Sequence, residues 1–126
     1  MIVVIDDERT FTQPVDRYAR TSDEGLGLLA RFFTQWYMAP YGGSQPIEEL
    51  WLDHDLGNGD DIRPVVDFLI SLGDATDYDD GHGSMVSGFI SNIYVHSQNP
   101  TVDWMIGTLS EYYPNVKRVP LPEMAV

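Results

Sequence analysis

Three short apolar segments of the chain each end abruptly in polar, ionisable residues. Residues Ile2 to Ile5 (IVVI) are followed by DDER, and Glu49 to Leu52 (ELWL) are followed by DHD. Residues Phe89 to Val95 (FISNIYV) are followed by HSQNP, and VKRVPL near the C-terminus is a fourth candidate. Continuous apolar runs of this length are typical of strands buried on both faces. The sequence therefore predicts a parallel sheet whose strands end in chemically reactive side chains.

Segments with helical periodicity lie between these runs. Apolar residues recur there at spacings of three and four, after residues that can begin a helix. The recurring residues are Leu26, Leu29, Phe32, Phe33 and Trp36 after Thr21 or Ser22, Ile62, Val65, Val66, Leu69 and Ile70 after Asp60 or Asp61, and Val102, Met105, Ile106 and Leu109 after Asn99-Pro100. The alternation of strands and helices predicts an α/β three-layer sandwich with right-handed crossovers. Arg17 to Arg20 (RYAR) is predicted to be a short extra strand before the first helix.

Composition restricts the class of protein. The 126 residues fit one compact domain, 1–126, and the net charge of −13 disfavours binding to long nucleic acid. The chain has no cysteine, which excludes disulfides and thiolate metal sites. No apolar run is long enough to span a bilayer, and the first residues are too acidic for a signal peptide. We expect a cytoplasmic protein without membrane contact, and the oligomeric state stays open.

The polar residues after each apolar run are expected to meet. In an open parallel sheet, ligands bind beyond the carboxyl ends of the strands, which lie about 4.8 Å apart. Several carboxylates gathered there would raise one another's pKa values unless a cation compensates their charge. We expect a hard divalent cation, Mg²⁺ first with Mn²⁺ or Ca²⁺ as alternatives, held by Asp6, Asp7, Asp53 and Asp55. The alternative is that these aspartates are solvated strand ends and helix caps.

Two histidines and one arginine accompany these acids. His54 and His96 can act as acid and base near neutral pH, although a single histidine at a strand end is commonly a hydrogen-bonded surface residue. Arg9 is a candidate phosphate ligand because its guanidinium can donate two parallel hydrogen bonds. A salt bridge from Arg9 to the neighbouring acids is the alternative, and the sequence leaves both open.

The segments VIDDER, LWLDHDLG and YVHSQNP together resemble the signature of the cyclic-phosphate-processing receiver family, a divergent branch of response-regulator receiver domains. The resemblance extends from Ile2 to about Tyr112. It implies a receiver-like (flavodoxin-like), mostly parallel sheet in the order 2-1-3-4-5 with a short second strand. The interval between the first two motifs indicates that one helix of the receiver pattern is lost or reduced.

The resemblance also implies roles for single residues. Asp6 and Asp7 match the acidic pair that holds Mg²⁺ in receivers, and Asp53 matches the aspartate that accepts the phosphoryl group. Ser97, or alternatively His96, would match the hydroxyl residue after the fourth strand. Lys117 comes too early in VKRVPLP to match the receiver lysine, which makes phosphotransfer signalling a weaker expectation.

Two functions of different classes follow. The first is a metal-assisted phosphoesterase that acts on a cyclic phosphate or a related small phosphoester. The predicted catalytic residues are His96, His54 and Asp53, and the predicted contacts to phosphate are Arg9, Ser97 and Asn99. The alternative is a non-catalytic receiver-like regulatory or partner-binding module, which uses the acidic edge only to bind a cation or a partner.

Overall fold

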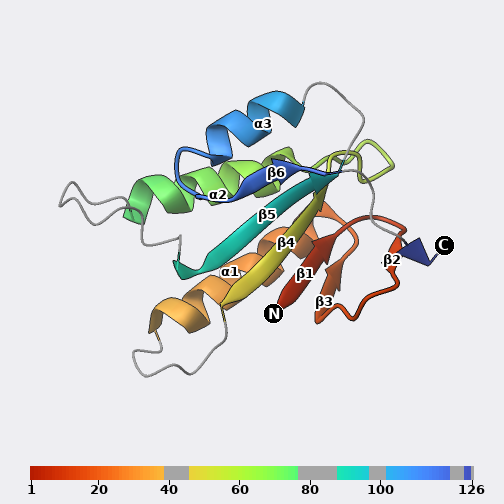
Figure 1. Cartoon of the computed structure of the whole chain (residues 1–126), viewed down its shortest axis with the longest axis horizontal. Coiled ribbons are helices and arrows are strands. Elements are labelled where there is room, and N and C mark those ends of the chain that lie inside the picture. The colour runs from red at the N-terminus through yellow and green to blue at the C-terminus, as the bar shows by residue number, and fades with distance from the viewer. Residues whose placement is uncertain (39–45, 77–87, 97–101, 120–123, 126) are drawn as a thin grey trace.

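The computed structural model describes residues 1–38, 46–76, 88–96, 102–119 and 124–125 of the chain. Its centre is a five-stranded parallel sheet in the order β3-β1-β4-β5-β6 (Figure 1). The strands are β1 (Ile2–Ile5), β3 (Arg17–Ala19), β4 (Ile47–Asp53), β5 (Ile90–His96) and β6 (Val116–Arg118). Numbered along the chain, this is the order 2-1-3-4-5 with a short second strand, so the predicted α/β, receiver-like sheet is confirmed.

The helices are α1 (Ser22–Met38), α2 (Arg63–Thr76) and α3 (Val102–Leu109), as the apolar periodicity predicts. Two of the predicted caps are present. The Thr21 hydroxyl accepts a hydrogen bond from the backbone N–H of Glu24 at 3.1 Å, and the Asp61 carboxylate accepts one from Arg63 at 2.8 Å. Such bonds satisfy N–H groups that have no partner within the helix.

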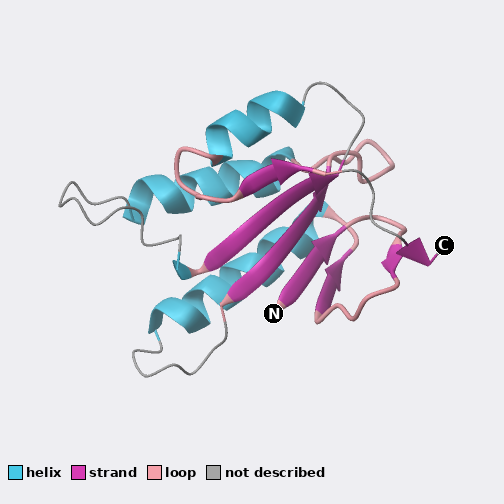
Figure 2. Cartoon of the chain, in the orientation of Figure 1, coloured by secondary structure: helices cyan, strands magenta, loops and turns pink. Residues whose placement is uncertain are grey.

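One face of the sheet carries the main hydrophobic core. Alternate strand residues point toward the helices, and the buried side chains include Val3, Ile5, Leu50, Leu52, Ile93 and Val95 from the strands and Leu29, Val65, Leu69, Met105 and Leu109 from the helices. All three described helices contribute to this cluster, and Figure 2 shows them on the same side of the sheet.

The opposite face carries a smaller cluster in which Val4, Phe11 and Trp51 are buried. No helix residue from the described ranges belongs to it. Phe11 lies in β2 (Thr10–Phe11), which pairs antiparallel with β7 (Met124–Ala125), and its backbone N–H donates to the Tyr18 hydroxyl at 2.9 Å. In place of a helical layer, this face is therefore covered by a short strand pair and the loops around it. Within the described residues the helices form one layer, so the third layer of the predicted sandwich is not found there.

The reason for this asymmetry is the short connection between β1 and β3. Residues 6–16, all of which the structure describes, contain the two-residue strand β2 and no helix. A parallel crossover normally needs a dozen or more residues and a helix. The expected loss or reduction of one receiver helix is confirmed at this connection.

The sequence also predicts loops at residues 38–46 and 73–84, and most of both segments lies outside the described residues. Helix α2 continues to Thr76, so the start of the acidic segment 73–84 is helical and its later part is not described. The segment 38–46 is described only at its two ends. None of the helices in the described part of the chain has the length and apolar character needed to cross a membrane.

Candidate cation-binding site

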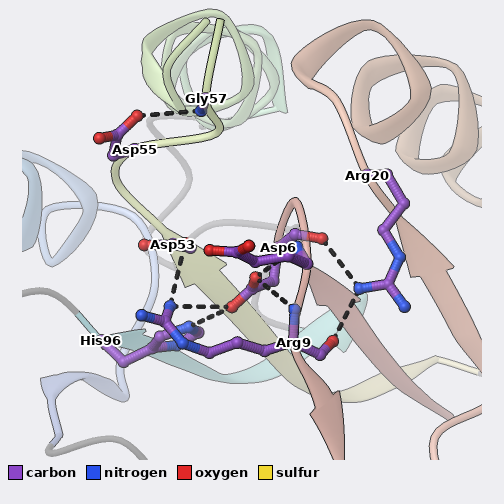
Figure 3. Close-up of polar contacts among 8 residues, drawn as sticks. Asp6, Arg9, Arg20, Asp53, Asp55, Gly57 and His96 are labelled. Atoms are coloured by element: carbon purple, nitrogen blue, oxygen red, sulfur yellow. Dashed lines mark hydrogen bonds and ion pairs between the residues drawn. The ribbon is translucent and has the colours of Figure 1, made fainter. Parts of the chain in front are cut away.

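Three candidate site residues are positioned by the carboxyl ends of three adjacent strands. Asp6 follows β1, Asp53 is the last residue of β4, and His96 is the last residue of β5, paired in register with Asp53. Their preceding neighbours point toward the helices, so strand alternation directs all three to the opposite face. One ligand atom from each lies within 4.8 Å of the others, and all three residues are buried (Figure 3). The predicted convergence of these segments is confirmed for these three residues.

The Asp6 carboxylate is held by four hydrogen bonds from described residues. Its Oδ1 accepts the backbone N–H groups of Glu8 at 3.1 Å and Arg9 at 3.0 Å. Its Oδ2 lies 3.0 Å from Nε2 of His96 and 3.3 Å from Nη1 of Arg9. The local turn DDER thus folds back on its own first acid, which fixes the orientation of that carboxylate.

The two buried carboxyl groups have opposite pKa shifts. Burial alone would raise the pKa of Asp6, but the bonds from His96 and the two backbone N–H groups, together with the Arg9 charge, hold this pKa well below its usual value. Burial and the negative charge of Asp6 raise the pKa of Asp53 from 3.8 to about 6, against the opposing effect of His96 and Arg9. Asp6 therefore stays ionised, whereas the negative charge of Asp53 is not fully compensated by the neighbouring positive groups.

Arg9 connects the two acids. Its Nη1 lies 3.3 Å from Oδ2 of Asp6 and also 3.3 Å from Oδ2 of Asp53, and its side chain is 36% exposed. This contact matches the salt-bridge alternative for Arg9. Because the Arg9 side chain is partly exposed, it links the two buried acids to the surface of the molecule.

Arg20 holds the loop that carries Arg9. Its Nη1 donates to the backbone carbonyl of Asp6 at 3.2 Å and to that of Arg9 at 2.7 Å, and its guanidinium lies over the Tyr18 ring, 4.6 Å from the centroid. The sequence analysis did not identify this residue. A signal existed, because Arg20 follows β3 and so ends a sheet strand at the same edge as Asp6.

His96 is fully buried beneath the two acids. Since Asp6 stays ionised, its contact with His96 makes Nε2 the donor and places a proton on that nitrogen. The other nitrogen, Nδ1, is buried and finds no hydrogen-bond partner within the described ranges. The ring packs edge-on to Phe11 and beside Trp51, with centroids 6.2 and 6.0 Å away. In this arrangement His96 orients Asp6 and has no open path to solvent.

The other predicted residues of the second motif lie outside this group. Asp55 is exposed, and its carboxylate accepts the backbone N–H of Gly57 at 2.9 Å, away from Asp53 (Figure 3). His54 is half-buried and is not one of the three clustered ligands. His54 directly follows the last residue of β4, and the alternation of strand side chains would direct it away from Asp53.

Asp7 stays close to the site without joining the cluster of three. A Cβ added to Gly57 would lie 2.9 Å from Oδ2 of Asp7, so this carboxylate packs against the glycine. Asp7 also contributes to raising the pKa of Asp53. Gly57 has a φ of 77°, a conformation that suits glycine, and its missing side chain leaves room for Asp7.

The remaining residues named from the sequence are Ser97 and Asn99, predicted to contact phosphate, and Lys117, which was not expected to match the receiver lysine. Ser97 and Asn99 lie outside the described residues. Lys117 is exposed in the middle of β6, where it pairs in register with Tyr94 rather than with His96. The expectation that Lys117 does not match the receiver lysine agrees with this position.

The donor set fits a divalent cation. Two carboxylates, buried within 4.8 Å of each other, supply the oxygen ligands that Mg²⁺ prefers, and the imidazole, whose Nε2 donates to Asp6 here, would supply the nitrogen that Mn²⁺ also accepts only after losing that proton. A cation there would also compensate the unneutralised charge that raises the pKa of Asp53.

Comparison with known proteins agrees with this geometry. The family model described as "Cyclic-phosphate processing Receiver domain" matches residues 1–111. Searches of curated proteins and of solved structures found no match. The matched region contains the whole cluster and four of the five strands of the sheet. The chain therefore belongs to the cyclic-phosphate processing receiver domains.

Proposed function

We propose that this protein is a metal-assisted phosphoesterase that opens a cyclic phosphate or cleaves a related small phosphoester. The observation that carries the proposal is the convergence of Asp6, Asp53 and His96 within 4.8 Å at the carboxyl edge of the sheet. Membership of a family associated with cyclic-phosphate processing supports the choice of substrate class.

In this proposal Asp6 and Asp53 hold the cation, with Asp7 close enough to contribute through a bound water. A divalent cation, Mg²⁺ in the first instance and Mn²⁺ or Ca²⁺ as alternatives, supplies charge compensation and lowers the pKa of bound water. Asp55 is left out of the ligand set, because its carboxylate is committed to the Gly57 N–H. Its role is to shape the loop that follows Asp53.

Arg9 is the proposed contact to the phosphate oxygens, since its partly exposed guanidinium is the most accessible positive group of the cluster. Ser97 and Asn99 remain predicted phosphate contacts from their position in the third motif. Hydrolysis of a cyclic phosphate breaks one P–O ester bond, and water adds to phosphorus to give a monoester. The freed alcohol oxygen takes up a proton.

His96 is proposed to act through Asp6 in the described conformation. Its Nε2 is engaged with Asp6 and the ring is fully buried, so direct proton transfer to substrate requires the site to open. His54 is proposed to assist from the neighbouring position. The predicted acid–base role of both histidines is best tested by separating cation binding from turnover.

The test is a turnover screen with purified protein and Mg²⁺ or Mn²⁺. Cyclic nucleotides with 2′,3′ and 3′,5′ rings, small cyclic phosphodiesters and linear phosphoesters are incubated, and ³¹P NMR follows the formation of monoester. We expect hydrolysis of at least one cyclic substrate, a loss of about 100-fold or more in kcat/KM for Asp53→Asn, and loss of activity on chelation.

Two matched pairs of variants sharpen the screen: Asp53→Asn with Asp55→Asn, and His96→Gln with His54→Gln. Asp55→Asn changes the same charge two residues away and should keep activity near the wild-type value. His96→Gln should reduce activity, whereas His54→Gln should reduce it less. A panel left intact by the wild-type protein, with no effect of His96→Gln on any property of the site, would remove the phosphoesterase from consideration.

A specific observation favours the non-catalytic alternative. Arg9 already supplies a positive charge to both acids, and Lys117 lies away from His96 on β6. A receiver-like module that only binds a cation or a partner would need no more than this. Incubation with Mg²⁺ and acetyl phosphate separates the two functions: cation binding without turnover supports the module, and an added phosphoryl group on Asp53 supports phosphotransfer signalling.

A further inference from the structure

The Asp6 carboxylate offers no unused position to a cation in the described conformation. A carboxylate has about four lone-pair positions. Those of Asp6 receive the backbone N–H groups of Glu8 and Arg9 on Oδ1, and His96 Nε2 and Arg9 Nη1 on Oδ2. A cation can therefore bind Asp6 only when one of these four donors leaves.

The four donors differ in their freedom to leave. The two backbone N–H groups belong to a turn that Arg20 holds by two carbonyl contacts. The His96 ring is fully buried and packed against Phe11 and Trp51. The Arg9 guanidinium is partly exposed, sits on a long flexible side chain, and makes the longest of the four contacts at 3.3 Å. Arg9 is the donor that can be displaced.

The same guanidinium nitrogen also contacts Asp53. Because Nη1 lies 3.3 Å from both Oδ2 atoms, it occupies the space between the two acids that a shared cation would need. Both acids would have to be released together. Once released, the guanidinium would stand at the solvent side of the cluster with its hydrogen-bond donors unpaired, and would bind well to an anion with several oxygens.

We propose that Arg9 is an internal counterion which is exchanged on ligand binding: a divalent cation displaces it from Asp6 and Asp53, and a phosphate anion then takes it as partner. This inference rests on the proposed function. Its consequence is that cation and phosphate bind cooperatively, because each ligand removes a cost of binding the other. The coupling is reciprocal, as thermodynamic linkage requires.

The experiment measures cation binding by calorimetry on the full chain, with Mg²⁺ alone and with Mg²⁺ in the presence of inorganic phosphate. Arg9→Gln removes the counterion. Arg31→Gln is the matched control, since Arg31 is exposed on α1 and its loss changes the net charge equally. Without phosphate, we expect Arg9→Gln to bind Mg²⁺ about tenfold more tightly than the wild-type protein, with Arg31→Gln close to wild type.

Phosphate should separate the proteins further. We expect it to tighten Mg²⁺ binding by roughly fivefold in the wild-type protein and in Arg31→Gln, and clearly less in Arg9→Gln, which has no guanidinium to transfer. Arg9→Lys keeps a charge but not the planar donor set, and should fall between the two. This variant carries the comparison should circular dichroism show that Arg9→Gln is unfolded.

The possible outcomes separate a failure of the Arg9 counterion exchange from a failure of the proposed metal-assisted function. Mg²⁺ binding that is equal or weaker in Arg9→Gln than in Arg31→Gln overturns the counterion exchange and leaves the cation site in place. Equal tightening by phosphate in the wild-type protein and Arg9→Gln overturns the transfer to phosphate. Absence of Mg²⁺ and Mn²⁺ binding in all of these proteins overturns both the exchange and the metal-assisted function.

Discussion

The two faces of the same sheet have different tasks. The face that packs on the helices carries the main apolar core, with fully buried residues such as Leu52 and Ile93 from the strands and Leu69 from α2. In the described residues, the opposite face has a small apolar cluster around Trp51. At the carboxyl ends of its strands it carries the buried Asp6, Asp53 and His96. Strand alternation therefore separates the apolar core from the buried ionisable residues, since neighbours such as Leu52 and Asp53 point to opposite faces of the sheet.

The absence of a helix over the second face, within residues 6–16, has a consequence for the site. The connection that would otherwise hold a helix is free to fold back at DDER, and it brings Arg9 over Asp6 and Asp53. Loops around a rigid sheet are the usual carriers of function. The shortened connection therefore places the positive charge of Arg9 beside the buried Asp6 and Asp53.

The largest expected effect lies on the helix-covered face. Leu69→Ala removes a fully buried side chain of α2 and should lower the free energy of unfolding by about 3 kcal/mol, because it leaves a cavity in the main core. Urea denaturation measures this loss, and calorimetry on the folded variant should give unchanged cation affinity. A large change in cation affinity with intact folding would show that the two faces are not independent.

The next effect concerns pH and lies on the opposite face. Because the pKa of Asp53 is raised from 3.8 to about 6, the folded state retains a proton there that the unfolded state has lost. Stability from this group is therefore present at low pH and is lost as pH rises through that window. Between pH 4.5 and 7.5, without divalent cations, the wild-type protein should lose about 2 kcal/mol relative to Asp53→Asn.

The sign for Asp6 is the opposite. Its lowered pKa stabilises the folded state above the ordinary carboxyl range, and that contribution is lost as pH falls below it. Asp6 is common to both proteins of the comparison, so the difference between them isolates Asp53. If the free energies of unfolding of the wild-type protein and Asp53→Asn differ by the same amount at every pH, the raised pKa of Asp53 is contradicted.

A smaller effect is expected at Arg20, which holds the loop of the site. Arg20→Gln removes the two contacts to the carbonyls of Asp6 and Arg9 and should cost about 1 kcal/mol of stability. Cation affinity should fall severalfold, since the turn that orients Asp6 loosens. Arg17→Gln, exposed at the start of β3, is the matched control and should change neither quantity. Equal effects of both variants would show that only the positive charge of Arg20 matters, and not its contacts to the two carbonyls.

The smallest effect tests the place of Asp7. Gly57 and Gly59 have nearly equal φ angles of 77° and 79°, so substitution by alanine carries a similar backbone penalty of about 1 kcal/mol at each. A new Cβ meets Oδ2 of Asp7 at Gly57 and nothing within 4 Å at Gly59. We expect Gly57→Ala to weaken cation binding by about threefold relative to Gly59→Ala. Identical cation affinities would place Asp7 outside the site.

Much of the fold was predictable from the sequence for a simple physical reason. Buried parallel strands must be apolar throughout, so their ends are visible as abrupt changes to Asp6, Asp53 and His96. The helices were visible from their periodic apolar faces and from the caps Thr21 and Asp61. The interval between the motifs VIDDER and LWLDHDLG already indicated a lost or reduced helix.

The details of the site were less predictable, because they depend on contacts between distant segments. Alternation along β4 could have separated His54 from Asp53, but the direction of Asp55 depends on a turn after the strand has ended. The contact of Arg9 with Asp53 spans 44 positions of the chain. Charge alone left Arg9 equally suited to a phosphate or a salt bridge, and the folded turn shows the salt bridge to Asp6 and Asp53.

The most direct test of the cation site is a calorimetric titration of Mg²⁺ and Mn²⁺ into the wild-type protein, Asp53→Asn and Asp55→Asn. Both variants remove one carboxylate charge and keep a hydrogen-bond acceptor. We expect the wild-type protein and Asp55→Asn to bind one cation with similar affinity, and Asp53→Asn to bind it at least about tenfold more weakly. Equal binding by the two variants, or weaker binding by Asp55→Asn, would contradict a site built on Asp6 and Asp53.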